Sequence, residues 1–159
     1  MKGLFTSEQV NVRQGMDLVE LQLGSHKIRL YYHDVFTICS KLQGNATFAL
    51  RYERNHPKVW AELNKYEREP ASVPLHTTYR RSGLVSNVKT YKISFEGSLV
   101  KMQFNELEAT FHYSDIPRIR AHMYRAAKDA KRWAGDSGRQ WSIFARLTTA
   151  EENDKFAFG

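Results

Sequence analysis

Two stretches decide the predicted fold: LVELQLGSHKIRLYYHDVFTICSKL (residues 18–42) and LVKMQFNELEATFHYSDIPRIRAHM (residues 99–123). In each, apolar residues first alternate with polar ones and then recur every three or four positions. Alternation is typical of half-buried strands, and the longer spacing is typical of an amphipathic helix. Each stretch therefore predicts antiparallel strands that lead directly into a helix.

The two stretches belong to longer segments that align without a gap at an offset of 81, residues 10–52 over residues 91–133. Substitutions between them mostly keep apolar residues apolar, as at Val12/Ile93 and Leu30/Phe111. Nine aligned pairs are identical: Leu18/Leu99, Val19/Val100, Gln22/Gln103, Tyr32/Tyr113, Asp34/Asp115, Ile38/Ile119, Ala46/Ala127, Ala49/Ala130 and Arg51/Arg132. This pattern predicts an internal duplication.

The expected fold is α+β, with two tandem β-meander-plus-helix repeats (ββββα-like) that form one pseudo-twofold domain. We expect helices to begin near Asp34 and Asp115 and to pack on their own sheets. Gly44 is expected to weaken the first helix, and Gly135 to end the second. The segments KGLFTSEQ and VPLHTTYRRSG are expected to supply the leading strands of units one and two.

The whole chain, residues 1–159, is expected to form a single domain. It divides into repeat one (1–53), a helical connector (54–75), repeat two (76–135) and a C-terminal extension (136–159). The connector is expected to be helical because HPKVWAELNKYEREP spaces Val59, Trp60, Leu63 and Tyr66 along one helical face.

The composition favours an anionic partner. Lys and Arg number 24 against 17 Asp and Glu, which leaves a net charge of +7. The excess is +5 in residues 71–159 (fourteen basic minus nine acidic) and +2 in residues 1–70 (ten minus eight), so the electrostatic footprint is expected in the second half. A single cysteine, Cys39, excludes an internal disulfide. The lack of an apolar membrane span or signal-peptide core predicts a cytoplasmic protein, in host cytoplasm if it is viral.

A duplicated antiparallel meander followed by one helix resembles the PUR-domain, Whirly and transcriptional-coactivator superfamily. GSLVKMQF resembles the glycine, polar residue and alternating strand of a PUR repeat, and the stretches from Ile28 and Ala109 resemble the family's strand-to-helix junction. The Whirly KGK-type signature and the Lys-Gly-Arg-Phe core of PUR repeats are absent. The resemblance implies a sheet surface for the unstacked bases of single-stranded nucleic acid.

Strand alternation places basic and aromatic side chains on the face opposite the core, where cations neutralise phosphates and rings stack on bases. The candidate nucleic-acid-binding residues are Arg13, Lys27, Arg29 and Tyr31 in unit one, and Tyr79, Arg80, Arg81, Lys92, Lys101 and His112 in unit two. The alternative interpretation is that these cations only keep the outer face soluble.

Catalytic and metal-binding functions are not predicted, and no cofactor is expected. The six histidines and Cys39 lack the spacing of a zinc site, and no phosphate-binding or nucleophile motif occurs. The basic helix around Arg118–Arg132 is expected to be a solvated face rather than a reader of duplex DNA.

The predicted function is sequence-tolerant binding of single-stranded DNA, in replication, recombination or transcription. Single-stranded RNA binding, a role as a transcription cofactor, and docking of an acidic protein partner remain alternatives. A homodimer contact through WSIFARL, and recruitment of replication or transcription proteins by the tail with Glu151, Glu152, Asp154, Phe156 and Phe158, also remain open.

Overall fold

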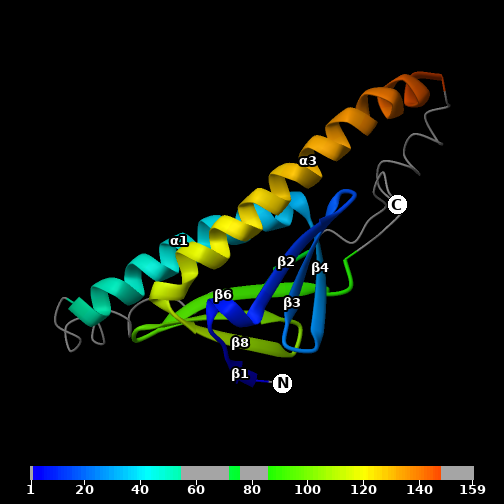
Figure 1. Cartoon of the computed structure of the whole chain (residues 1–159). Coiled ribbons are helices and arrows are strands. Elements are labelled where there is room, and N and C mark those ends of the chain that lie inside the picture. Colours follow the sequence, from blue (N-terminus) through cyan, green and yellow to red (C-terminus); the bar gives the residue numbers. More distant parts are fainter. Residues whose placement is uncertain (1, 55–71, 76–85, 148–159) are drawn as a thin grey trace.

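A computed structural model describes residues 2–54, 72–75 and 86–147, which form an α+β fold with two sheets and two long helices (Figure 1). The five-stranded sheet has the order β1-β8-β7-β6-β5, with β1 (Lys2–Leu4), β5 (Val73–Pro74), β6 (Thr90–Glu96), β7 (Leu99–Phe104) and β8 (Leu107–His112). The three-stranded sheet has the order β2-β3-β4, with β2 (Val10–Gly15), β3 (Leu18–Leu23) and β4 (His26–Tyr31). The helices are α1 (Tyr32–Arg54) and α3 (Ile116–Leu147), and two short 3-10 turns are η1 (Ser7–Gln9) and η2 (Tyr113–Asp115).

Strands β2, β3 and β4 form one antiparallel meander, and β6, β7 and β8 form a second with the same register. Val12 faces Leu21, and Ile93 faces Met102, each 81 positions further on (12 + 81 = 93; 21 + 81 = 102). All other residue pairs of the two meanders keep this offset. The strands predicted from the alternating pattern are present in both meanders.

The tight turns of the meanders correspond in the same way. Left-handed backbone occurs at Met16 (φ 56°) and Gly24 (φ 61°) in the first meander, and at Gly97 (φ 58°) and Asn105 (φ 52°) in the second. Short hairpin loops need this conformation because it matches the twist of the flanking strands, and Gly and Asn adopt it most easily. Met16 is the exception in residue type, and its side chain is 48% exposed.

One hydrophobic core joins the buried faces of the two sheets and of the two helices. Leu21 and Leu30 from the first meander and Met102 and Phe111 from the second are fully buried. Full burial of such a side chain contributes roughly 1.5–3 kcal/mol to folding, so these alternating positions dominate the stability of the sheets.

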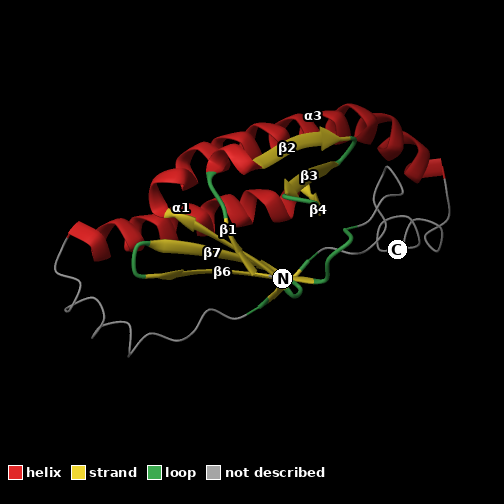
Figure 2. Ribbon diagram, turned by 60° about the horizontal axis from the view of Figure 1, so that its bottom comes forward, coloured by secondary structure: helices red, strands yellow, loops and turns green. Residues whose placement is uncertain are grey.

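Each helix packs mainly against the meander of the other half, so the expectation that each covers its own sheet is wrong. Helix α1 lies on β6 and β7, whereas α3 lies on β2 and β3, as Figures 1 and 2 both show. The helices also pack against each other. At this contact the Arg120 Nε donates to the carbonyl of Cys39 (3.1 Å), and the Cys39 thiol donates to the carbonyl of Arg120 (3.8 Å). The two halves are therefore interleaved rather than set side by side.

The N-terminal segment also crosses between the halves. Strand β1 pairs in parallel with β8, Gly3 facing Ala109, and the N–H of Phe5 continues the contact by donating to the carbonyl of Thr110. The expectation that residues 2–9 lead the sheet of unit one is therefore wrong. The leading strand of unit two is represented by β5, which pairs with β6. The segment 76–85 lies outside the described residues.

Both helices continue through the glycine at which the sequence predicts a weakening (Gly44) or an end (Gly135). Helix α1 runs uninterrupted through Gly44, and α3 continues beyond Gly135 to Leu147. A helical glycine costs only about 1 kcal/mol relative to alanine, and neither glycine has the positive φ of a helix-ending cap. The predicted connector helix lies mostly outside the described residues, except that Val73 and Pro74 of the connector form a strand.

Candidate nucleic-acid interface

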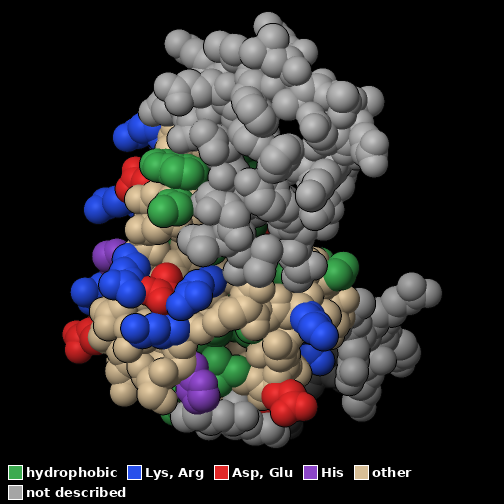
Figure 3. Space-filling view, turned by 90° about the vertical axis from the view of Figure 1, so that its right-hand side faces the viewer, with side chains coloured by type: hydrophobic (Ala, Val, Ile, Leu, Met, Phe, Trp, Pro, Cys, Tyr) green, Lys and Arg blue, Asp and Glu red, His purple; other side chains and the backbone are tan. Residues whose placement is uncertain are grey.

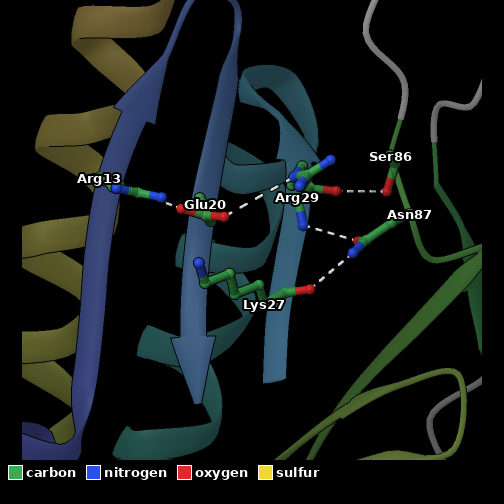
Figure 4. A network of polar contacts seen from close by, with 6 residues as sticks. All are labelled: Arg13, Glu20, Lys27, Arg29, Ser86 and Asn87. Atoms are coloured by element: carbon green, nitrogen blue, oxygen red, sulfur yellow. Dashed lines mark hydrogen bonds and ion pairs between the residues drawn. The ribbon is translucent and has the colours of Figure 1, made fainter. Parts of the chain in front are cut away.

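The outer face of the three-stranded sheet carries a row of charged side chains across all three strands. Arg13 of β2 faces Glu20 of β3, and Glu20 in turn faces Arg29 of β4. Because directly opposed residues point to the same side of a sheet, the three side chains lie in line, as Figure 4 shows. Lys27 of β4 shares their outward phase, and it faces Gln22 in the next row. The predicted residues of unit one are thus brought together.

Glu20 orders this row electrostatically. The Nε of Arg13 donates to one carboxylate oxygen of Glu20, and the Nε of Arg29 lies 3.9 Å from the other. The hydrogen bond from Arg13, helped by the charges of Arg13, Lys27 and Arg29, lowers the pKa of Glu20 although burial acts in the opposite direction. The carboxylate therefore stays ionised near neutral pH.

The row nevertheless remains cationic and accessible. Three cations and one carboxylate leave a net charge of +2 on this face. The side chains of Arg13 and Arg29 are 71% and 52% exposed, whereas that of Glu20 is only 13% exposed. In Figure 3, Lys and Arg side chains gather beside acidic ones on the side of the molecule that carries these strands. A phosphate reaching this face meets the guanidinium groups before it meets the carboxylate.

A segment from the second half holds the open edge of β4 (Figure 4). The Asn87 side chain accepts from the N–H of Arg29 (2.9 Å) and donates to the carbonyl of Lys27 (2.7 Å). The hydroxyl of Ser86 donates to the carbonyl of Arg29 (2.7 Å). Side-chain groups thus occupy the hydrogen-bonding positions that another strand would take. This contact fixes the backbone from which Lys27 and Arg29 project. It also covers part of an exposed strand edge, which could otherwise pair with a strand of another chain.

Tyr31 closes one end of the same face. It is half-buried and packs against the core, with its ring centroid 4.3 Å from that of Tyr32 and 5.3 Å from that of His33. Its strand partner Leu18 helps to line a shallow hollow of about 320 Å³ together with Arg13, Gln14, Gly15, Glu20 and Arg29. The ring is held in place by its neighbours, and the residue is partly exposed to solvent.

The corresponding face of the five-stranded sheet differs in charge. The row equivalent to Arg13, Glu20 and Arg29 is Ser94, Lys101 and Thr110. The amine of Lys101 contacts the Glu96 carboxylate and lies 3.7 Å from that of Glu108, and the contact with Glu96 raises the pKa of Lys101. Over β6, β7 and β8, Lys92 and Lys101 are balanced by these two glutamates, so these three strands add no net charge to the face. Among the described strands, the outer face of the first half is therefore the more cationic one, while Arg80 and Arg81 of the second half lie outside the described residues.

One further predicted site residue that the structure describes, His112, lies outside both rows. His112 bridges β8 to the end of α1, because its Nε2 lies 3.2 Å from a carboxylate oxygen of Glu53 while its Nδ1 accepts from the N–H of Ser114. This position links elements of the fold, and the ring is engaged on both nitrogens. Tyr79, Arg80 and Arg81 lie outside the described residues.

Three residues of the candidate interface were missed by the sequence analysis. Glu20 could have been found, because the alternation that points Arg13 and Arg29 outward also places Glu20 between them. Ser86 and Asn87 carry no periodic signal, since their role depends on a contact between segments 57 to 60 positions apart.

The described residues also bear on metal groups, membrane spans and the thiol of Cys39. Among these residues, no three His, Cys, Asp or Glu side chains gather in a group suited to a metal ion, and no helix is long and apolar enough to cross a membrane. Burial raises the pKa of the Cys39 thiol to about 11, which disfavours a reactive thiolate. No protein-family model, curated protein or solved structure matches this chain.

Proposed function

We propose that this chain is a non-catalytic, sequence-tolerant single-stranded DNA-binding protein whose main contact surface is the outer face of β2, β3 and β4. The observation that carries the proposal is the exposed cationic row Arg13–Glu20–Arg29, with Lys27 beside it and the Tyr31 ring at one end. Exposed guanidinium groups suit phosphates, and an adjacent ring suits any base.

The proposed mechanism separates attraction from positioning. Arg29 and Lys27 neutralise backbone phosphates, and Asn87 holds the strand on which both are mounted. Glu20 restrains Arg13 and Arg29 in the absence of DNA and is displaced from one of them when a phosphate binds. An unstacked base then covers the exposed part of Tyr31. None of these contacts reads a base edge, so the binding tolerates sequence.

We further propose that the two halves are tandem copies of one repeat, as in the PUR, Whirly and transcriptional-coactivator superfamily. The shared register at an offset of 81 supports this origin, as does the reciprocal contact of Cys39 with Arg120, which are themselves 81 positions apart. A pseudo-twofold axis would pass through that contact. On this proposal, the outer face of the first copy kept an excess of cations, while β6, β7 and β8 of the second copy acquired as many glutamates as lysines.

A salt-dependent titration with oligothymidylate tests the binding surface. The Lys27→Gln/Arg29→Gln variant should bind more weakly and should lower the magnitude of the slope of log K against log salt by roughly 1.4, at about 0.7 for each lost phosphate contact. The matched control, Lys92→Gln/Lys101→Gln, removes two charges from the other sheet face and should change the slope less. RNA and duplex DNA of the same length complete the comparison.

The proposal fails if the Lys27→Gln/Arg29→Gln variant keeps the affinity and the slope of the wild type. A larger loss in Lys92→Gln/Lys101→Gln would move the interface to the five-stranded sheet. If the protein binds RNA more tightly than DNA, the proposed surface remains the same and the ligand is RNA, because a basic and aromatic sheet can bind either nucleic acid.

A further inference from the structure

The exposed side of α3 concentrates the positive charge of the second half. Residues 116–135 include six Lys or Arg and one acidic residue, Asp129, so this segment alone carries +5. Arg118, Arg125, Lys128, Lys131 and Arg132 are exposed, while Ile119, Met123, Ala127 and Ala130 are buried on the opposite side of the helix. The cations therefore form one face rather than a scattered set.

Three of the cations form a straight stripe. Arg125, Lys128 and Arg132 are spaced i, i+3 and i+7, which places them on one side of the helix over roughly 10 Å at about 1.5 Å per residue. They border a shallow hollow of about 380 Å³, whose lining also includes Arg120 and Tyr124. The stripe is thus long enough to accompany two or three phosphates of an extended strand.

Aromatic rings contact one cation of the stripe, Lys128, and two cations next to the stripe, Arg120 and Lys131. Tyr124 is 43% exposed, and the cationic groups of Arg120 and Lys128 lie 5.9 Å and 5.8 Å from its ring centroid. Its ring meets that of Phe36 edge-on at 5.3 Å, and the Lys131 amine lies 6.0 Å from the Phe36 centroid. These contacts order the cations without neutralising them, because the rings carry no net charge.

The stability of the helix does not account for this arrangement. Like charges three or four positions apart, such as Arg125/Lys128 and Lys128/Arg132, destabilise a helix slightly. Asp129 lies 3.9 Å from Arg132, with the two side chains 49% and 73% exposed, and exposed pairs of this kind contribute little. The arrangement is instead complementary to a polyanion.

We propose that this face of α3 is a second, sequence-independent contact for the phosphate backbone of the same nucleic acid, engaged only by strands longer than the sheet face can hold. The inference rests on the proposed function. Helix α3 covers the inner side of the three-stranded sheet, so the exposed face of α3 and the outer face of the sheet point in opposite directions. Strand β2 forms one edge of this sheet. A strand must pass around that edge to touch both.

The test compares Arg125→Gln/Lys128→Gln/Arg132→Gln with a control of equal charge loss, Arg51→Gln/Arg54→Gln/Lys89→Gln, whose three cations are also exposed. Gln has nearly the helix propensity of Lys and Arg, so folding should be retained, and melting curves check this. The probes are oligothymidylates of about 8 and about 40 nucleotides, the shorter lying within the span of about 4–16 covered by one small binding fold.

For the longer probe, the α3 variant should lower the salt slope by roughly 2, which corresponds to a loss of roughly 100-fold at about 0.1 M salt. For the shorter probe it should match the control variant. Equal behaviour of the α3 and control variants on both probes would overturn the inference. The inference would also be overturned if the α3 variant lost affinity for polyglutamate but kept its affinity for the longer oligonucleotide. That result would indicate that the face binds an acidic protein.

The same experiment separates this inference from the proposed function. Suppose that Lys27→Gln/Arg29→Gln binds the short probe more weakly than the wild type, while the α3 variant binds both probes as the control variant does. The sheet interface is then supported and the α3 contact is refuted. If the α3 variant binds the longer probe more weakly while Lys27→Gln/Arg29→Gln keeps wild-type affinity for both probes, the α3 contact is supported and the sheet interface is refuted.

Discussion

Replacing Asn87 with alanine tests how the second half of the chain holds the candidate interface of the first. The substitution removes the two hydrogen bonds that join the Asn87 side chain to the N–H of Arg29 (2.9 Å) and to the carbonyl of Lys27 (2.7 Å). It changes no charge, so any effect on DNA binding must arise from the position of the strand. Asn11, exposed on β2, provides a matched control as Asn11→Ala.

The expected loss of stability follows from these two bonds. A typical hydrogen bond contributes about 0.5–1.5 kcal/mol net, so two contribute about 1–3 kcal/mol. Because Lys27, Arg29 and Asn87 are exposed, water can replace part of the contact, and the lower half of that range, about 1–2 kcal/mol, is expected. For a chain of this size the melting temperature should fall by roughly 2–8 °C. Asn11→Ala should change stability by less than about 0.5 kcal/mol.

Hydrogen exchange gives the sharpest readout. Opposed residues of an antiparallel pair alternate between bonded and non-bonded positions, so the N–H of Arg29 points to the open edge, where Asn87 protects it. In Asn87→Ala this amide should exchange faster, while that of Leu30, which faces Val19 inside the sheet, should keep its protection. If the Arg29 amide exchanges equally in Asn87→Ala and Asn11→Ala, and the two variants melt together, Asn87 does not hold this edge.

Four further outcomes are expected. Glu20→Gln should tighten binding to oligothymidylate, because it removes the carboxylate that competes for the arginines; an unchanged or weaker affinity would show that Glu20 does not compete. Since folding lowers the pKa of Glu20, its stabilising effect is present above the usual value of about 4.3 and is lost as the pH falls through the lowered value. Acid titration of stability should therefore be flatter in Glu20→Gln than in the wild type. With a thiol pKa of about 11, Cys39 should react with a disulfide reagent at pH 8 only when urea unfolds the chain, and rapid labelling of the native protein would contradict its burial. Tyr32→Ala should cost roughly 3 kcal/mol of stability, whereas Tyr31→Ala should cost less stability and weaken oligonucleotide binding by roughly 1–3 kcal/mol; the reverse order in melting and titration would refute the proposed strand phase.

The sequence alone determined the strands of the two meanders and which side of each of these strands is buried. Alternation in residues 10–31 and 91–112 placed Leu21, Leu30, Met102 and Phe111 in the core, and it placed Arg13 and Arg29 on the outer face. These features are local, because the period of the apolar residues follows directly from strand and helix geometry. The helix ends were less predictable from the sequence. The free energy gained by packing an apolar helix face is larger than the small cost of placing a glycine in a helix.

Only the tertiary structure decided which surfaces meet. An apolar stripe indicates that a helix packs on a sheet, but it does not indicate which sheet. The packing of α1 and α3 on the meander of the other half was therefore not predictable from periodicity. The neutralisation of Lys101 by Glu96 and Glu108, and the hold of Asn87 on β4, likewise depend on side chains that strand pairing and chain crossing bring together. Local period fixes the direction of a side chain, whereas its partner is set by the packing of the whole chain.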